Sequence, residues 1–149
     1  MYKNVVKKLI EQKLTIATAE SITGGLVAKM ITDVPGSSEI LKESFVVYSN
    51  EAKIKILGVD KDIIDKYGVV SKEVAEDMAK KLKELTNRDI CISTTGNAGP
   101  TVCDDKPVGR VYVGIYFKDG LKVYELNLLG EREDIRQKTA DFIFDNIKI

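Results

Sequence analysis

The stretch LTIATAESITGG, residues 14–25, decides the fold of this chain. Its first six residues, LTIATA, form a short, β-prone and apolar run, which is typical of a buried strand in a parallel sheet. The residues from Gly24 to Val34 then favour a helix that ends before Pro35. A buried strand that leads directly into a helix is the repeating unit of parallel α/β sheets. The pattern therefore indicates an α/β protein.

Strands and helices alternate along the rest of the chain. Further strands are expected at Ser44–Asn50 and Arg88–Thr95, followed by a hairpin around the turn Lys118-Asp119-Gly120. Helices are expected over residues 2–13, 50–57, 71–85 and from about Glu131. The helix 71–85, capped by Ser71, places on one face Val74, Ala75, Met78, Ala79, Leu82 and Leu85. The sequence thus predicts one three-layer α/β/α domain over residues 1–149, with a mixed, mainly parallel sheet and one antiparallel hairpin strand.

The charge balance excludes several kinds of partner. Lys and Arg total 23, and Asp and Glu also total 23, so the formal net charge is zero. A chain without net charge lacks the broad basic surface that binds nucleic acids and anionic lipids, so we expect neither as a partner. No apolar run is long enough to cross a bilayer, and the N-terminal residues show no signal peptide. A cytoplasmic location is therefore expected, with no membrane association.

The chain contains no histidine, which restricts the chemistry it can perform. Mechanisms that need a Ser-His-Asp or Cys-His arrangement are excluded, as are metal sites with histidine ligands. The two cysteines, Cys91 and Cys103, are too few for a zinc site. We expect no metal and no organic cofactor. If the protein is an enzyme, its general base must be Lys, Asp, Glu or Tyr.

In parallel α/β sheets, ligands bind at the carboxyl ends of the strands, and Ser21 follows the first strand. A serine at this position has two interpretations: it caps the following helix, or it is a nucleophile exposed at a strand-to-helix turn. The capping box is incomplete because Gly24 stands where Glu or Gln is expected. Gly24 and Gly25 weaken a helix, so we expect the backbone from Thr23 to Gly25 to lie close to a ligand and to bind it through N–H groups.

Lys53 and Tyr48 follow the second expected strand. Lys53 is either a solvated surface lysine or a general base whose pKa is lowered by burial and by its place in the first turn of a helix. Tyr48 is either an ordinary sheet tyrosine or a residue of the site.

Two more groups are candidates for substrate binding. Thr95, Gly96 and Gly99 lie in a strand-end loop that is either a simple turn or a backbone cradle for a phosphate or carboxamide. Arg132 and Arg136 are one helical turn apart, so they either clamp a phosphate or have a surface role.

Five segments, in this order, resemble the C-terminal domain of the CinA family: AESITGG, YSNEAK, GVVSKEVAEDMA, TGNAGP followed by KPVG, and GEREDIRQKT. The resemblance covers about residues 3–147. The molybdopterin-type N-terminal domain of longer CinA proteins is not in this sequence, so we expect the stand-alone form, the bacterial nicotinamide-nucleotide amidohydrolase. This resemblance implies a mixed α/β/α fold and a homodimer.

The resemblance also implies an activity: hydrolysis of the carboxamide of nicotinamide mononucleotide (NMN) to nicotinate mononucleotide and ammonia. The serine of the family falls on Ser21, its lysine on Lys53 and its tyrosine on Tyr48, where Tyr48 would orient Lys53 or relay a proton. The alternative is a non-catalytic module that binds a nucleotide or a partner, because CinA proteins have been linked to competence and recombination. Release of ammonia from NMN distinguishes the two.

The sequence departs from the family pattern at one loop. Relatives carry a glycine-rich run with a serine before the acidic pair, whereas this chain has Thr101-Val102-Cys103 before Asp104-Asp105. Asn97 replaces a residue that is usually apolar. We expect the loop Thr101–Asp105 to control substrate fit rather than the chemical step.

Overall fold

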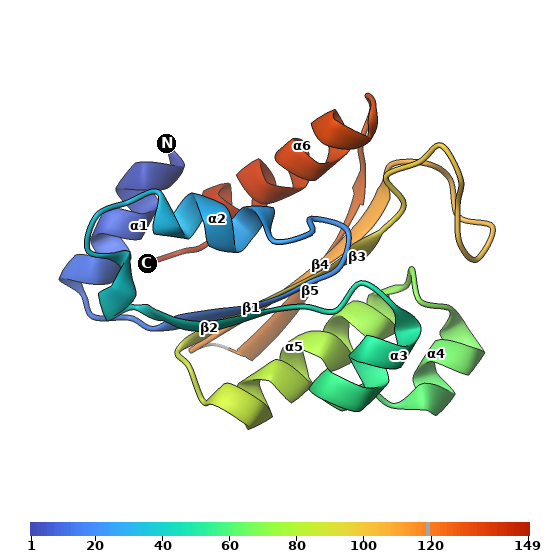
Figure 1. Ribbon diagram of the computed structural model, residues 1–149, viewed down its shortest axis with the longest axis horizontal. Helices are drawn as coiled ribbons and strands as arrows, with labels where there is room; N and C mark the ends of the chain where they lie inside the picture. The colour runs from blue at the N-terminus through green and yellow to red at the C-terminus, as the bar shows by residue number, and fades with distance from the viewer. Residues whose placement is uncertain (119) are drawn as a thin grey trace.

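A computed structural model describes residues 1–118 and 120–149. A five-stranded sheet lies between two layers of helices (Figure 1). The strand order is β2-β1-β3-β4-β5, and the strands are β1 (Ile16–Glu20), β2 (Leu41–Val46), β3 (Ile90–Gly96), β4 (Arg110–Phe117) and β5 (Gly120–Asn127). The expected hairpin is formed by β4 and β5, while Asp119 of its turn lies outside the described residues.

The directions of the strands agree with the expected mixed sheet. β1 pairs in parallel with both β2 and β3, whereas β4 is antiparallel to both β3 and β5. Among the five described strands, β4 therefore runs against the other four. The carboxyl ends of β1, β2 and β3 consequently meet at one edge of the sheet, at the right of Figure 1.

One layer of helices covers each face of the sheet (Figure 1). The first layer holds α1 (Tyr2–Glu11), α2 (Leu26–Thr32) and α6 (Arg132–Asp145). The second holds α3 (Asn50–Ala52), the π-helical turn Lys53–Leu57, α4 (Lys61–Tyr67) and α5 (Lys72–Thr86). A cluster of buried aliphatic side chains fills the space on each side of the sheet. No helix among the described residues is long and apolar enough to cross a membrane.

Two expected boundaries were wrong. The second strand begins at Leu41 and ends at Val46, so Tyr48 and Ser49 lie beyond it. This strand lies at an edge of the sheet, and its side chains alternate between partly buried and exposed. Its ends are therefore not marked by a continuous apolar run. The second helix begins at Leu26 rather than Gly24. Gly24 and Gly25 have φ values of +58° and +100°, a left-handed conformation that a helix interior does not allow.

The helix α5 packs across the sheet as its apolar spacing predicts, with Ser71 at its N-cap. The Ser71 hydroxyl accepts a hydrogen bond from the Val74 N–H at 3.2 Å and donates to the Gly68 carbonyl at 2.7 Å. The expected inner residue Leu85 is instead 56% exposed, because it lies in the last turn, where the sheet no longer covers the helix. The hydroxyl of Ser71 thus fixes the start of α5 to the preceding segment.

Replacing Ser71 with alanine should lower the free energy of unfolding by about 1 kcal/mol, because the N-cap acceptor is lost. Urea denaturation measures this change. The matched control is Ser38→Ala, since Ser38 is exposed in the turn before β2. This control should stay within about 0.5 kcal/mol of the wild type. Equal stability of all three proteins would show that the cap contributes nothing.

Candidate functional site

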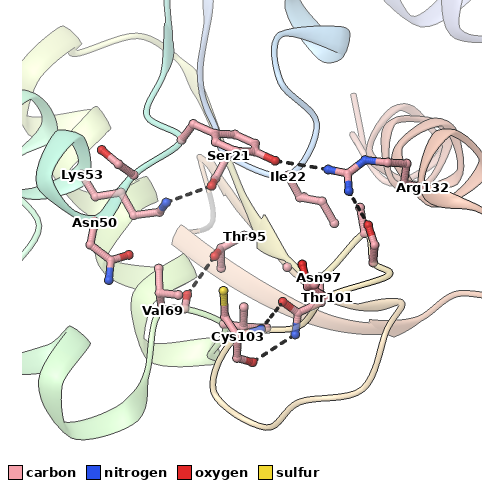
Figure 2. Close-up of a pocket in the computed structure, with 16 residues that line it drawn as sticks. Ser21, Ile22, Asn50, Lys53, Val69, Thr95, Asn97, Thr101, Cys103 and Arg132 are labelled. Carbon is pink, nitrogen blue, oxygen red and sulfur yellow. Dashed lines mark hydrogen bonds between the residues drawn. The ribbon is translucent and has the colours of Figure 1, made fainter.

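A cavity of about 200 Å³ opens where the carboxyl ends of β1 and β3 meet the segment after β2 (Figure 2). Its lining is drawn from five separate parts of the chain. The lining residues are Ser21, Ile22, Tyr48, Ser49, Asn50, Lys53, Val69, Val70, Thr95, Gly96, Asn97, Ala98, Gly99, Thr101, Cys103 and Arg132. The structure thus brings together seven of the predicted site residues: Ser21, Lys53, Tyr48, Thr95, Gly96, Gly99 and Arg132.

Ser21 lies directly after β1 and does not cap α2. Its backbone N–H donates to the Thr94 carbonyl and to the Thr94 hydroxyl, each at 3.1 Å, so the residue is held against the end of β3. The N-cap of α2 is Gly25, four residues further on. The Ser21 side chain is 8% exposed and points into the cavity (Figure 2). Its hydroxyl is therefore free of any capping role.

The carboxylate of Glu20 caps α2 instead. Its two oxygens accept hydrogen bonds from the N–H groups of Val27 and Ala28, at 2.9 and 3.0 Å. They also accept from the hydroxyl groups of Thr23, at 2.6 Å, and Thr18, at 3.1 Å. This carboxylate is fully buried, so its four donors replace water. Glu20 thereby ties the end of β1 to the first turn of α2 and fixes the turn that carries Ser21.

The predicted binding role of Thr23, Gly24 and Gly25 is not supported by their positions. None of the three lines the cavity. Gly24 has a left-handed backbone that favours glycine, and the group nearest to a Cβ atom there would be the Arg136 guanidinium, at 3.0 Å. Arg136 donates to the Thr23 carbonyl at 3.0 Å and also lies outside the cavity lining. Of the expected Arg132/Arg136 pair, only Arg132 therefore lines the cavity.

Lys53 lies 1% exposed at the start of the π-helical turn. Its Nζ atom donates to Ser21 Oγ at 2.8 Å and to the Val47 carbonyl at 2.9 Å (Figure 2). Burial lowers the pKa of Lys53 from 10.5 to about 8, and Cys103 opposes this shift in part. Ser49, not Asn50, caps the short helix before it, since its hydroxyl accepts from the Ala52 N–H at 3.0 Å.

Tyr48 and Arg132 meet at the mouth of the cavity. One guanidinium nitrogen of Arg132 lies 3.3 Å from the Tyr48 hydroxyl, and another donates to the Gly99 carbonyl (Figure 2). Tyr48 is 63% exposed and forms no hydrogen bond with Lys53 among the described residues. The expectation that Tyr48 orients Lys53 is therefore not met by this geometry, and its hydroxyl contacts Arg132 instead.

The loop after β3 forms the opposite wall. Thr95 donates from its hydroxyl to the Val69 carbonyl at 2.8 Å. A Cβ atom at Gly96 would lie 2.8 Å from the Arg110 carbonyl oxygen, and one at Gly99 would lie 2.7 Å from the Val108 side chain. Packing therefore requires glycine at both positions, whether or not a ligand binds. The loop Thr101–Asp105 contributes Thr101 and Cys103 to the lining, at the place where the sequence departs from the family pattern.

Sequence reasoning missed several residues of this site. Glu20 was overlooked because its capped N–H groups lie seven and eight residues away, whereas known capping motifs span three. Ile22, Ser49, Asn50, Val69 and Val70 line the cavity through chain geometry that no local pattern signals. Among residues 1–118 and 120–149, no three His, Cys, Asp or Glu side chains gather as metal ligands would.

Comparisons with known proteins agree on one family. The family model of the CinA C-terminal domain matches residues 1–149. A protein of Clostridium novyi described as competence-damage inducible is 51% identical over 135 residues, which are 90% of this chain and 33% of that protein. One from Thermoanaerobacter pseudethanolicus is 47% identical over 99% of this chain and 36% of its own length. The chain thus spans about a third of the curated relatives it matches.

Solved structures show the same fold. A CinA superfamily protein from Escherichia coli aligns with a TM-score of 0.91 and 28% identity, over 97% of this chain and 87% of that one. A competence/damage inducible protein from Agrobacterium tumefaciens aligns with a TM-score of 0.89 and 30% identity, over 97% and 92% of the two chains. The expected three-layer fold is confirmed by these neighbours.

We expect Lys53 to titrate with a pKa of about 8. NMR of the lysine side chains measures this value, with Lys53→Met to assign the signal and Lys29 as the contrast, because Asp33 raises the Lys29 pKa. Unfolding restores a pKa of 10.5, so the unfolded chain binds more protons between pH 8 and 10.5. The free energy of unfolding should therefore gain a contribution from Lys53 as pH rises through this window. A titration midpoint above 10 would contradict the assignment.

Proposed function

Since this chain belongs to the CinA C-terminal domain family, we propose that it hydrolyses the carboxamide of NMN to nicotinate mononucleotide and ammonia. The observation that carries this proposal is the 2.8 Å contact between Ser21 Oγ and Lys53 Nζ at a cavity wall. A serine becomes nucleophilic when a base within hydrogen-bond distance removes its proton. In a chain without histidine, a buried lysine supplies that base.

The surroundings of Lys53 suit a neutral amine. A pKa of about 8 leaves about a tenth of the amine unprotonated at pH 7, far more than a lysine with a pKa of 10.5 would have. A neutral amine has two N–H donors and one lone pair. If one N–H remains bonded to the Val47 carbonyl, the lone pair can accept the Ser21 hydroxyl proton. The hydrogen bond to the Val47 carbonyl would then orient the Lys53 amine so that its lone pair faces the Ser21 hydroxyl.

The proposed reaction is a two-step acyl transfer. Lys53 takes the Ser21 proton while Ser21 Oγ bonds to the carboxamide carbon, and the carbonyl π electrons move to its oxygen. The tetrahedral intermediate collapses, the C–N bond breaks, and the Lys53 ammonium returns the proton to the leaving nitrogen, which departs as ammonia. Water then attacks the acyl-enzyme with Lys53 as base, the bond between Ser21 Oγ and the acyl carbon breaks, and nicotinate mononucleotide leaves as Ser21 regains its proton. No metal or organic cofactor takes part.

The developing oxyanion needs a donor, and Ile22 is better placed than the residues first expected. Gly24 N–H is already bonded to the Ser21 carbonyl at 3.1 Å, and Gly24 lies outside the cavity. Ile22 follows the nucleophile directly and lines the cavity. The N–H of the residue after the nucleophile is an oxyanion donor in other acyl-transfer enzymes. We therefore assign this part to the Ile22 N–H, an interaction worth about 3–4 kcal/mol in known cases.

The charges around the cavity favour an anionic substrate. The guanidinium of Arg132 lines it, whereas none of the lining residues that the structure describes is Asp or Glu. A guanidinium at the mouth suits the phosphate of a mononucleotide. Tyr48 lies beside Arg132, where its ring can cover the cationic pyridinium of NMN through a cation–π contact. The phosphate site is thus assigned to Arg132 alone.

We retain a non-catalytic binding module as the alternative function. The curated relatives are about three times as long as this chain, and they are described only as competence-damage inducible. The assembly into a homodimer stays a prediction. Ammonia release from NMN separates the two functions: a binding module would bind the nucleotide without turnover.

Ser21→Ala and Lys53→Met should each abolish ammonia release from NMN, and the double variant should be hardly worse than either single one. The two side chains act as one unit, so their effects are not additive. A coupled assay for ammonia measures turnover, and calorimetry measures NMN binding, which Ser21→Ala should retain. The rate of the wild type should rise with pH along a limb centred near the Lys53 pKa of about 8.

Ser38→Ala and Lys148→Met are the matched controls, because both residues lie outside the cavity lining. They should leave turnover unchanged. Substantial turnover by Ser21→Ala would remove Ser21 from the chemistry and make Cys103, which also lines the cavity, the next nucleophile to test.

Arg132→Ala should lower kcat/KM for NMN at least tenfold, because a hydrogen bond to a charged group contributes roughly 1.5–3 kcal/mol. Turnover of the phosphate-free nicotinamide riboside should change much less, and comparison of the two substrates isolates the phosphate contact. Arg88→Ala is the matched control, since Arg88 pairs with Glu43 before β3, at the other end of that strand. An equal loss on both substrates would refute the phosphate assignment.

A further inference from the structure

Asn97 lies just after β3 and is 4% exposed. Its side-chain amide makes two hydrogen bonds with Cys103: Nδ2 donates to the Cys103 carbonyl at 3.1 Å, and Oδ1 accepts from the Cys103 N–H at 2.9 Å (Figure 2). Nδ2 also donates to the Lys106 carbonyl at 3.2 Å. Its own backbone is fixed as well, since its N–H donates to the Arg110 carbonyl and its carbonyl accepts from Gly109. A single buried side chain thus holds the middle and the end of the loop 101–106.

The other side of this loop is attached to the segment between α4 and α5. The Asp104 carboxylate accepts from the Val70 N–H at 2.9 Å, and Lys106 Nζ donates to the Val70 carbonyl at 2.9 Å. Gly68 allows this approach, because a Cβ atom there would lie 2.6 Å from the Asp104 carboxyl carbon. The loop therefore bridges the end of β3 and the start of α5 and is attached at both sides.

The attached loop forms one wall of the cavity. Thr101 and Cys103 line it together with Val69 and Val70, while Ser21 and Lys53 lie across the cavity (Figure 2). None of the bonds that Asn97 makes reaches Ser21 or Lys53, so Asn97 acts on the shape of the cavity rather than on the reacting atoms.

We propose that Asn97 determines substrate specificity by holding the loop 101–106 as a fixed wall, which limits the size of the ring that carries the carboxamide. The part of this inference that concerns substrate rests on the proposed function, whereas the wall itself does not. An apolar side chain at position 97 could satisfy none of the three loop groups, which would then need water. The short loop and Asn97 therefore depend on each other.

The first test measures the wall without any substrate. Hydrogen–deuterium exchange of the Cys103 and Val70 amides should be slow in the wild type and at least tenfold faster in Asn97→Ala, because local opening no longer has to break the amide contacts. Asn97→Asp should have a similar effect, since its carboxylate places oxygen against the carbonyls of Cys103 and Lys106. It also provides a second variant if Asn97→Ala does not fold. Unchanged exchange protection of the Cys103 and Val70 amides in a folded variant would show that Asn97 does not hold the loop.

The second test measures substrate choice. Asn97→Ala should raise KM for NMN about tenfold and lower kcat less, the pattern expected when uniform binding is lost. It should also raise the turnover, relative to that of NMN, of an analogue that carries an extra ring methyl group, because the loop 101–106 is then free to move away from the larger ring. Asn146→Asp is the matched control, since Asn146 makes a side-chain bond to the Phe142 carbonyl at 2.8 Å outside the cavity. A variant with lost amide protection but wild-type KM and selectivity would overturn the specificity role.

These results are separable from the proposed function. If the wild type released no ammonia from NMN, the proposed function would fail, while the exchange data would still decide whether Asn97 fixes the wall. NMN should also slow maleimide labelling of Cys103, and the buried Cys91 provides the internal reference. If saturating NMN left the rate of Cys103 labelling unchanged, the substrate would bind away from this loop and the proposal would be overturned.

Discussion

The buried carboxylate of Glu20 fixes the geometry on which the cavity depends. A carboxylate without water must have its oxygens satisfied, and here two backbone N–H groups and two threonine hydroxyl groups do so. These donors belong to β1, to α2 and to the turn between them. Because Ser21 is the residue after Glu20, these bonds fix the turn from which the Ser21 side chain contacts Lys53. Ser21 is thus positioned by a neighbour that is not part of the cavity lining.

Glu20 and Lys53 show two opposite ways of burying an ionisable group. Glu20 is surrounded by donors, which stabilise a negative charge. Lys53 has two neutral acceptors, Ser21 Oγ and the Val47 carbonyl, and within residues 1–118 and 120–149 it forms no hydrogen bond with a carboxylate. Burial without a counter-charge disfavours the ammonium, so the pKa of Lys53 falls. A carboxylate within hydrogen-bond distance of Lys53 Nζ would instead stabilise the ammonium and raise the pKa of Lys53.

The sequence predicted the parts of the site that follow from strand ends. Ser21 and Lys53 each come shortly after a strand of a parallel sheet, and the absence of histidine left lysine as the best base. It could not separate Arg132 from Arg136. Residues four apart share a helix face, but which partner each guanidinium reaches depends on loops packed against α6. The capping by Glu20 was hidden for the same reason, since tertiary approach rather than local spacing brings its donors together.

The cavity lining gives no support to the prediction that Gly24 and Gly25 mark a ligand, for a related reason. A glycine in sequence signals an unusual backbone or a close approach, but not what approaches. At Gly24 the approaching group is the Arg136 guanidinium, and at Gly96 it is the backbone of β4. The loop Thr101–Asp105 was expected to control substrate fit, and two of its residues, Thr101 and Cys103, line the cavity. Its attachment through Asn97 was not foreseen.

The use of α6 at the cavity has a consequence for synthesis of the chain. Arg132 contacts Tyr48, 84 positions earlier, and Arg136 contacts Thr23, 113 positions earlier. Bonds between such distant positions form only after the intervening sheet has closed. A nascent chain on the ribosome therefore carries Ser21 and Lys53 long before the mouth of the cavity exists. The complete lining of the cavity should therefore form only after α6 has left the exit tunnel.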